Sequence, residues 1–378
     1  MKTPLCLESS NSGYVLAMCR GRIACLGFSL LFVLVACGNT AAPASAPAVD
    51  VDFGALDVAL EEWSQNVPGG AVGLVRLADG QMHLFDVGED ASSGEPLSAS
   101  DRVRVGSISK VYTATLVLQL VDDGLVELDE PVGTYLPGTS VSNAITVRHV
   151  LAHQSGIPNY TEVPQLIEAS IDTPTLQFEP ETIVDFVADD SDFSPGDRFS
   201  YSNTNFIVAG QIVEAVTGET LEEAFQSQIA EPLELVDTSF DDGSVGDVAS
   251  GYSLALIEGN SGSRNYQSIA ELAWAAGSLV TTVEELAVFL DALLVEERLI
   301  SSDSLEAMIG NVPAGADYGL GLAPGTDFGL GHGGSIFGFN SDAQLNPETG
   351  EMVIVVVNND IRRPSIATEL ITDFVGIE

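Results

Sequence analysis

Cysteine and lysine are nearly absent from most of this 378-residue chain. All four cysteines lie within the first 37 residues, and Lys110 is the only lysine after Lys2. Residues 38–378 can therefore form no disulfide, thiol nucleophile or cysteine-based metal site. Hydrophobic residues make up 45% and charged residues 18% of the chain, as in a globular protein. The length fits one large domain or two moderate domains that share a core.

Positive charge is also scarce. Lys and Arg number 13 against 55 Asp and Glu, which gives a formal net charge of −42. The sequence has no basic stripe to neutralise phosphates, so the composition argues against a nucleic-acid partner. Anionic membrane surfaces should also repel the folded body. We interpret the acidity as a solvated surface rather than as a specific cation site.

Residues 1–36 have the pattern of a secretory signal peptide. Arg20 and Arg22 precede the apolar run Ile23–Ala36, which is shorter than a membrane span requires. The run leads into Leu-Val-Ala-Cys, ending at Cys37. This ending resembles the bacterial lipoprotein signal, in which the cysteine is lipidated and becomes the mature N-terminus. An ordinary signal peptide with an incidental cysteine is the alternative.

The lipoprotein resemblance implies a protein tethered to a membrane. Residues 37–50 are small, contain proline and lack apolar periodicity, as expected of a flexible tether. The protein would then be anchored through Cys37 to the cell envelope, on its extracytoplasmic side, at the periplasmic face or the cell surface. Met18 is an alternative start to Met1, because residues 1–17 add nothing that a signal needs.

Beyond residue 50, strand patterns lie at both ends of the chain and helical patterns lie between them. The expected strands are Ala71–Leu77, Gln81–Val87, Arg102–Val105, Tyr318–Leu322, Phe328–His332, Phe339–Leu345 and Glu351–Val357. The expected helices are Val51–Gln65, Ser107–Asp123, Thr146–His153, Pro180–Asp189, Thr204–Val216, Leu221–Ile229 and Ile366–Val375. We therefore predict one mixed α/β domain over 51–378. Its sheet is completed by the C-terminal segment, and a mainly helical region at about 125–260 is inserted.

The first chemical motif is Gly-Ser-Ile-Ser-Lys at residues 106–110, where a helix is expected to begin. Lys110 lies one helical turn after Ser107, so the two side chains share a face. A serine hydroxyl needs a base to become a nucleophile. The helix N-terminus disfavours a second positive charge, which pushes Lys110 toward its neutral, basic form. Taken alone, the motif also fits a solvated lysine after an N-cap serine, but the scarcity of lysine favours the catalytic interpretation.

The second motif is Tyr201-Ser202-Asn203, which follows a Pro-Gly-Asp turn. A tyrosine can relay protons to a leaving group if a nearby cation depresses its pKa. The side chain of Asn203 can hydrogen-bond both a substrate carbonyl and Lys110. By itself, the motif is equally compatible with a turn that carries an aromatic anchor.

The third motif is Gly-His-Gly-Gly-Ser at residues 331–335, at the end of an expected strand. Glycine permits close approach of a substrate backbone to the edge of a sheet. The N–H group of Ser335 could pair with that of Ser107 to form an oxyanion hole. Alone, a glycine-rich segment with one histidine is compatible with a turn.

Together and in this order, the three motifs resemble the penicillin-recognising serine enzymes, the family of serine β-lactamases and D-alanyl-D-alanine carboxypeptidases. Tyrosine in the second motif is typical of the branch with class C β-lactamases, D-aminopeptidases and family VIII esterases. The resemblance extends from about residue 55 to the C-terminus. It implies an antiparallel sheet with helices on both faces, and an active site between the sheet and the inserted helical region. The mechanism that the resemblance implies requires no metal or organic cofactor.

The resemblance also implies a two-step acyl transfer to and from a small acyl substrate. Ser107, deprotonated by Lys110 with Tyr201, attacks a carbonyl group. The backbone N–H groups of Ser107 and Ser335 hold the oxyanion, and Tyr201 protonates the leaving group. The substrate-binding residues implied in this way are Asn203, His332, Gly333 and Gly334.

The sequence departs from the family pattern in the third motif. Class C β-lactamases have Lys-Thr-Gly where this chain has His332 followed by two glycines. A histidine is less reliably cationic than a lysine and anchors a substrate carboxylate less well at neutral pH, which disfavours efficient β-lactam hydrolysis. Outside the motifs, we assign His149 and His153 to structure, and we give His83, on an expected exposed strand, no role.

We expect an extracytoplasmic serine hydrolase that acts as a D,D-peptidase or a related D-amino-acid peptidase. A family VIII-type esterase comes next, and a weak class C-like β-lactamase third. The alternative from a different class of function is a non-catalytic ligand sensor or scaffold on the same fold. A binding module, however, would not need Lys110 as a base. The physiological substrate, the acyl acceptor and the oligomeric state stay open.

Overall fold

The computed structural model describes residues 51–65, 68–173, 175–187, 191–241, 246–253, 267–310, 318–324 and 328–377. The chain divides into two units, Met1–Ser45 and Ala46–Glu378, and only the second contains described residues. The expected signal peptide, Cys37 and the 37–50 tether lie outside the described residues.

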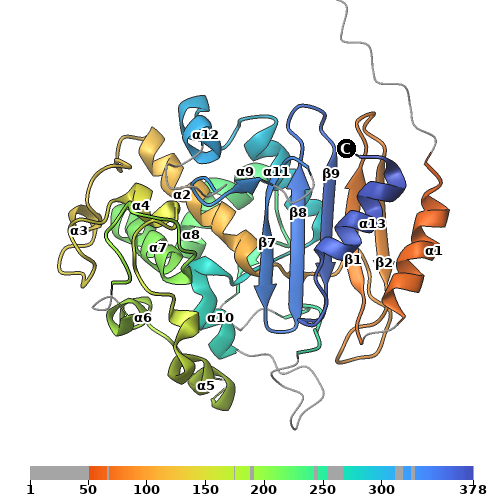
Figure 1. The fold of residues 1–378 in the computed structure, drawn as a ribbon, viewed down its shortest axis with the longest axis horizontal. Helices are drawn as coiled ribbons and strands as arrows, with labels where there is room; N and C mark the ends of the chain where they lie inside the picture. Colours follow the sequence, from red (N-terminus) through yellow and green to blue (C-terminus); the bar gives the residue numbers. More distant parts are fainter. Residues whose placement is uncertain are drawn as a thin grey trace, which may run out of the picture. The chain divides into compact units, whose positions relative to one another are not determined.

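A six-stranded sheet joins the two ends of the second unit, with the strand order β2-β1-β9-β8-β7-β6 (Figure 1). Every neighbouring pair in it is antiparallel. β1 pairs on one side with β2 and on the other with β9, from the far end of the chain. The C-terminal segment thus completes the sheet, as expected. The strands are β1 (Ala71–Arg76), β2 (Met82–Val87), β6 (Ala323–Pro324), β7 (Leu330–Ile336), β8 (Phe339–Leu345) and β9 (Met352–Val357).

Helices cover both faces of this sheet, which confirms the predicted fold class. β9 is apolar throughout because both of its faces are buried. Alternate residues such as Val353 and Val355 pack in a core cluster with α1 and α13. Their neighbours, such as Ile354, join the larger core cluster with α2 and α11. These helices are α1 (Phe53–Ser64), α2 (Ser109–Asp122), α11 (Val283–Leu294) and α13 (Ser365–Val375).

A second, three-stranded sheet has the order β3-β5-β4. β3 leads directly into the first motif, because a 3₁₀ turn at Gly106–Ile108 follows it and α2 continues from that turn. The first motif is therefore held between this small sheet and the start of a buried helix. The strands are β3 (Val103–Arg104), β4 (Ser239–Phe240) and β5 (Leu279–Thr281).

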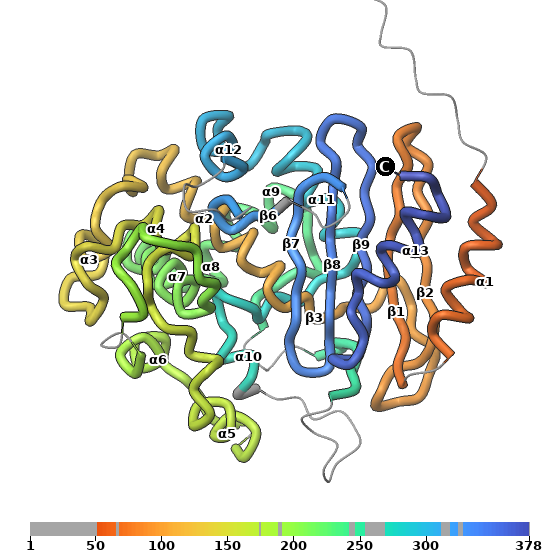
Figure 2. Tube along the Cα trace, in the orientation of Figure 1, coloured from red at the N-terminus to blue at the C-terminus, as the bar shows by residue number. Residues whose placement is uncertain are grey.

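Most of the remaining helices follow α2 in the chain and lie beside β7 (Figure 2). α7 is central among them, since it packs against α2, α4, α6 and α8. The predicted helix at 221–229 begins at Leu221 but continues beyond Phe225 as a π-helix, Gln226–Ala230. The helices are α3 (Val132–Tyr135), α4 (Val147–Leu151), α5 (Pro164–Asp172), α6 (Pro180–Val187), α7 (Asn203–Thr217), α8 (Leu221–Phe225), α9 (Glu231–Leu233), α10 (Gln267–Ala273) and α12 (Ser302–Ile309).

Two sequence expectations about the last third of the chain are wrong. Residues 318–322 form a turn instead of a strand, in which Gly319 N–H donates to the Leu322 carbonyl at 2.7 Å. Gly321 has φ +81°, a left-handed conformation that breaks strand geometry and that glycine adopts without strain. The third motif lies inside β7 instead of at the end of a shorter strand.

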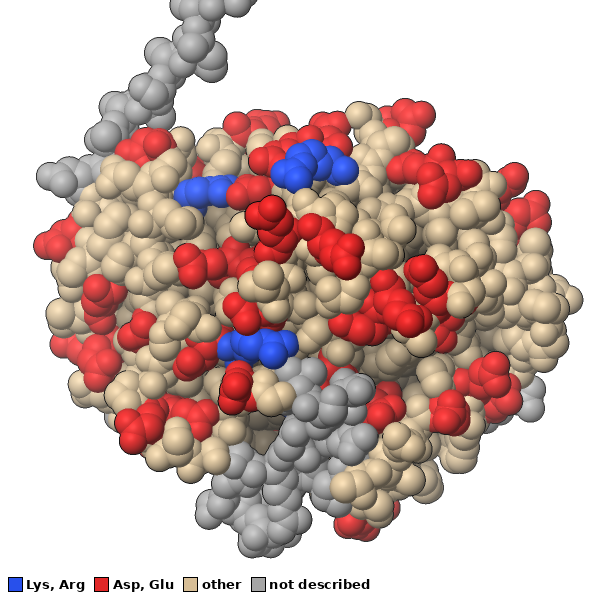
Figure 3. All heavy atoms as spheres, turned by 180° about the vertical axis from the view of Figure 1, so that it is seen from behind, with Lys and Arg blue, Asp and Glu red and all other residues tan. Residues whose placement is uncertain are grey.

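Acidic side chains are spread over the surface and outnumber basic ones on the face shown in Figure 3. Two of the arginines that the structure describes are ion-paired with carboxylates and largely buried: Arg76 with Asp291, and Arg104 with Asp241. Within the described ranges, no helix combines the length and the apolar character needed to span a membrane.

Candidate active site

The first motif is held against β7 by a close backbone approach. Gly106 has φ +52°, and a Cβ atom on it would lie 2.8 Å from the backbone nitrogen of Ser335. A Cβ atom on Gly334 would lie 2.0 Å from the Val105 carbonyl oxygen. Glycine at both positions is therefore needed to bring Ser107 beside Ser335. Gly334 thus has a packing role in addition to the substrate approach that the sequence suggested.

Lys110 is fully buried and reaches three oxygen atoms. Its Nζ lies 2.9 Å from Ser107 Oγ, 2.7 Å from Asn203 Oδ1 and 2.5 Å from the carbonyl oxygen of Ala276. Burial lowers the pKa of Lys110 well below its ordinary value. The two carbonyl oxygens can only accept, so they take the two hydrogens of the neutral amine. The remaining lone pair then faces the Ser107 hydroxyl, which is the geometry of a general base.

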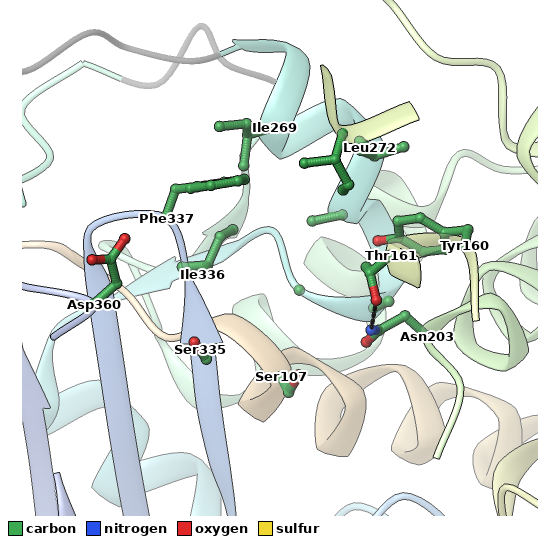
Figure 4. A pocket seen from close by; sticks show the side chains of 14 residues that line it. Ser107, Tyr160, Thr161, Asn203, Ile269, Leu272, Ser335, Ile336, Phe337 and Asp360 are labelled. Atoms are coloured by element: carbon green, nitrogen blue, oxygen red, sulfur yellow. Dashed lines mark hydrogen bonds between the residues drawn. The ribbon is translucent and has the colours of Figure 1, made fainter. Parts of the chain in front are cut away.

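Asn159, which lies outside the three sequence motifs, sets the orientation of the Asn203 amide. Its Oδ1 accepts from the backbone N–H of Asn203 at 3.0 Å and from Asn203 Nδ2 at 3.2 Å. Asn203 Nδ2 also donates to Thr161 Oγ1 at 3.4 Å (Figure 4). With the amide nitrogen held in this way, Asn203 Oδ1 is presented to Lys110.

Tyr201 shares a hydrogen bond with the Ser107 side chain. Its ring centroid lies 5.1 Å from Lys110 Nζ. Burial raises the pKa of Tyr201, and the hydrogen bond with Ser107 offsets this only in part. The net shift is thus opposite to the depression by a nearby cation that a proton relay through this tyrosine was thought to need. Tyr201 therefore keeps its proton at neutral pH and can donate it to a leaving group.

His332 is a neutral hydrogen-bonded group in this site. Its Nδ1 lies against the Gly333 carbonyl, which only accepts, so Nδ1 carries the hydrogen. Its Nε2 then accepts from the hydroxyl of Tyr318 at 3.0 Å. Burial, followed by the influence of Lys110, lowers the pKa of His332 to about 4. Both ring nitrogens are occupied and the ring is uncharged at neutral pH. We expected Tyr318 on a strand, and nothing in the sequence indicated its hydrogen bond with His332.

The other histidines lie where structural roles would place them. His153 is fully buried, and its ring centroid lies 4.2 Å from that of Tyr201. Its Nδ1 accepts from the backbone N–H of Ser202 at 3.2 Å, so it holds the second motif in place. His149 caps α4, where its Nδ1 accepts from the Thr146 N–H at 3.2 Å. His83 on β2 is half-buried and pairs with Asp57.

Two cavities meet at Ser107 and Ser335, and we name them after the second-motif residue that each contains. The Asn203 cavity has a volume of about 500 Å³ and is lined largely by apolar side chains (Figure 4). The Tyr201 cavity has a volume of about 510 Å³. The apolar side chains that line the Asn203 cavity are Ile167, Ile269, Leu272, Ala273, Ala276, Ile336 and Phe337. Besides Ser107, Tyr201 and Ser335, the residues that line the Tyr201 cavity are Ala323, His332, Gly333, Gly334, Ser341, Asp342, Gln344, Arg363, Pro364 and Ser365.

The chain is similar in sequence to known proteins. The model of the family described as Beta-lactamase matches residues 48–373. A D-aminopeptidase of Cereibacter sphaeroides is 27% identical over 345 residues, which cover 87% of this chain and 64% of that protein. The chain thus spans slightly less than two thirds of that relative's length.

Two solved structures share both the fold and part of the sequence. A D-stereospecific amidohydrolase from Streptomyces sp. superposes with a TM-score of 0.72 at 32% identity, over 85% of this chain and 98% of that one. The D-amino acid amidase from Ochrobactrum anthropi SV3, complexed with L-phenylalanine amide, also gives a TM-score of 0.72, at 26% identity over 85% and 97% of the two chains.

Proposed function

Because the chain belongs to the beta-lactamase family, we propose that it is a serine hydrolase that cleaves peptide or amide bonds of D-amino-acid substrates through an acyl-enzyme on Ser107. The observation that carries this proposal is the environment of Lys110, whose buried Nζ lies 2.9 Å from Ser107 Oγ between two carbonyl acceptors. The preference for D-amino acids is supported by the relatives, which are a D-aminopeptidase, a D-stereospecific amidohydrolase and a D-amino acid amidase.

In the first step Ser107 attacks the substrate carbonyl and gives its proton to Lys110. The ammonium that forms is stabilised by the Asn203 and Ala276 oxygens already bonded to it. In this proposal the backbone N–H groups of Ser107 and Ser335 hold the oxyanion. Tyr201 donates its proton to the leaving nitrogen, and the proton on Lys110 replaces it. Both groups are then neutral again, and the acyl group is an ester of Ser107.

In the second step water attacks this ester. Lys110 and Tyr201 accept the proton of the water and return one to Ser107 Oγ. The product is a free carboxylate, and the enzyme returns to its starting state. Every proton transfer in this proposed cycle starts or ends at Lys110, Tyr201 or Ser107 Oγ.

A substrate panel tests the proposal directly. The panel comprises D-Ala-D-Ala peptides, D-amino-acid amides, short-chain esters and a chromogenic cephalosporin, given to the soluble domain without residues 1–50. We expect the highest kcat/KM on a D-peptide or D-amide, with the matching L-compounds as controls. Higher kcat/KM on esters would favour the esterase alternative. Equal turnover of D- and L-compounds would contradict the proposed stereochemical preference.

Replacement of Tyr201 by phenylalanine should reduce turnover without abolishing acylation. The phenol donates a single proton, and removal of one acid–base group costs about 10²–10⁴-fold in rate. The ring itself would keep its packing against His153. The loss should be smaller for a p-nitrophenyl ester, whose leaving group needs no proton, than for an amide of the same acyl group. Equal losses on the two substrates would contradict the role of Tyr201 as the leaving-group acid.

We propose further that Cys37 is lipidated and holds the protein on the extracytoplasmic side of the cell envelope. The support comes from the short apolar run that ends at Cys37 and from the proline-containing segment after it. A single acyl chain gives only marginal binding, so stable attachment needs a multiply acylated cysteine. Mass spectrometry of the mature N-terminus should show the acylated cysteine, and Cys37→Ser should release the protein from membranes. An unmodified N-terminus beyond residue 37 would contradict the proposal.

A further inference from the structure

Both residues that flank Tyr201 are held by a single histidine. The backbone N–H of Ser200 donates to the carbonyl oxygen of His153 at 2.9 Å. The backbone N–H of Ser202 donates to the Nδ1 atom of the same histidine at 3.2 Å. The His153 ring also contacts the Tyr201 ring, with centroids 4.2 Å apart. Tyr201 is therefore fixed on both sides along the chain and by contact with its ring.

The partners of the His153 ring define its protonation state. Two donors face Nδ1, the backbone N–H of Ser202 and Asn205 Nδ2, each at 3.2 Å. The Asn205 amide is held in this orientation because its Oδ1 accepts from Ser155 Oγ at 2.5 Å. Nδ1 therefore carries no hydrogen, and the neutral ring carries its hydrogen on Nε2. Burial favours the same neutral state, because it lowers the pKa of His153 well below its ordinary value.

Two features of His153 reduce the stability of the folded chain. Its φ is +54°, a left-handed conformation that residues other than glycine adopt rarely. Its Nε2 is buried and has no hydrogen-bond partner within the part of the chain that the structure describes. The N–H group there loses its contact with water and gains no bond in return. Strained residues and unpaired buried groups cluster at active sites, which points to a functional role for this side chain.

The left-handed conformation alone has a simpler explanation, because residue 153 follows the end of α4. Helices often end in such a residue, which is usually glycine. Glycine at 153 would remove the strain and the unpaired Nε2, and its carbonyl would still accept from Ser200. It would lack only the imidazole, and with it the acceptor for Ser202 N–H and the contact with Tyr201. The end of the helix therefore explains the backbone of His153 but not its side chain.

We propose that His153 is a positioning residue that holds the Tyr201 hydroxyl where it can protonate the leaving group. This inference rests on the proposed function, in which Tyr201 donates its proton to the leaving nitrogen. Proton transfer depends strongly on geometry, and a misplacement of about 1 Å can cost on the order of 10²-fold in rate. His153 lines neither cavity, so it acts on the reaction through Tyr201 and not by contact with the substrate.

The test uses an amide and a p-nitrophenyl ester of the same D-amino acid, because only the amide needs a proton on its leaving group. The measured quantity is the ratio of kcat/KM for the amide to kcat/KM for the ester. His153→Phe keeps a ring against Tyr201 but loses Nδ1, so the ratio should fall about 10–10²-fold, less than in Tyr201→Phe. In the Tyr201→Phe background, His153→Phe should cause no further fall, because the hydroxyl that it would misplace is already absent.

Two further variants separate positioning from a merely structural role. In His153→Asn the amide Oδ1 can accept the Ser202 N–H in place of Nδ1, and asparagine tolerates the left-handed conformation, so the ratio should stay close to that of the wild type. His149→Phe is the matched control on α4, because His149 Nδ1 likewise accepts a backbone N–H, that of Thr146, at 3.2 Å. His149 lines neither cavity, so this variant should lower the melting temperature without changing the ratio.

A measurement on the wild type does not depend on the folding of any variant. The chain has four histidines, so their ring nitrogens can be resolved by ¹⁵N NMR, and the spectrum of His153→Asn assigns the signals of His153. At pH 7 we expect an unprotonated Nδ1 and a protonated Nε2 for His153. His332, whose Nδ1 lies against a carbonyl, should show the opposite tautomer.

Three results would overturn the inference about His153. They are a wild-type ratio in His153→Phe, a ratio in His153→Asn or His149→Phe that falls as far as in His153→Phe, and a protonated Nδ1 of His153 in the wild type. Equal losses on the amide and the ester leave the ratio unchanged and count as the first of these. If the wild-type enzyme cleaves neither substrate and gives no acyl adduct, the proposed function itself fails.

Discussion

Ser107→Ala is expected to abolish acyl-enzyme formation and to reduce turnover on the order of 10⁶-fold, as removal of a nucleophilic serine does in other hydrolases. Ser107 Oγ is the atom on which the Lys110 amine and the Tyr201 hydroxyl converge. The measurement is intact-mass detection of a covalent adduct with a fluorophosphonate or penicillin probe, followed by peptide mapping. Wild-type protein should gain one adduct, at Ser107, and the variant should gain none.

Ser302→Ala is a suitable control for this experiment. Ser302 is an exposed residue of α12 and lines neither cavity. This variant should label and turn over like the wild type. Labelling of the wild type at a residue other than Ser107, or full turnover by Ser107→Ala, would show that the nucleophile has been misassigned.

Lys110→Met should lose nearly as much activity as Ser107→Ala, because the members of a catalytic unit do not contribute additively. Methionine can occupy the same buried position, but its sulfur is only a weak acceptor and cannot take the serine proton as an amine does. Lys110→Arg should fail as well, since a guanidinium stays protonated and cannot act as a base. Steady-state kcat on the best substrate of the panel measures both losses.

The activity lost in Lys110→Met through the missing base must be distinguished from activity lost because the variant is less stable. Lys110→Met leaves the Asn203 and Ala276 oxygens without a donor, at a cost of about 1–3 kcal/mol for each buried group. Thr113→Val is the matched control on the same helix, because buried Thr113 Oγ1 donates to the carbonyl of Ala275 at 2.8 Å. Thr113→Val should lower the melting temperature and keep its activity. Comparable activity losses in both variants would point to a structural role for Lys110.

The sequence predicts those helices and strands whose apolar residues recur at a regular spacing. The apolar spacing of Val51–Gln65 and the run Phe339–Leu345 each give an element within a few residues of the observed one. The pairing of Ser107 with Lys110 follows from the pitch of a helix, and the structure places the two side chains in hydrogen-bond contact. Such local patterns need no knowledge of the tertiary fold.

The groups that complete the site come from tertiary contacts, which leave no local pattern. Ala276 contributes a backbone carbonyl, and no side chain marks that role in a sequence. Asn159 acts through the orientation of another amide, and Tyr318 through a histidine fourteen residues away. The Tyr201 pKa is raised and not depressed because the tyrosine is itself buried, and this burial follows from tertiary packing.

The pairing of β1 with β9 constrains the order in which this enzyme can fold. Strand partners such as Gly73 and Val355 are 282 positions apart in the chain, so closing this ladder requires the formation of a very long loop. Such non-local pairing is slow, and until β9 arrives β1 has an unpaired edge beside an apolar face. Ser107 follows β1 early in the chain, whereas Ser335 is supplied by β7 near its end. A nascent or C-terminally truncated chain therefore carries the nucleophile but lacks β7, which forms the other side of the site. Such a chain also exposes the aggregation-prone edge of β1. Hydrolytic activity is therefore expected only once the whole sheet has closed.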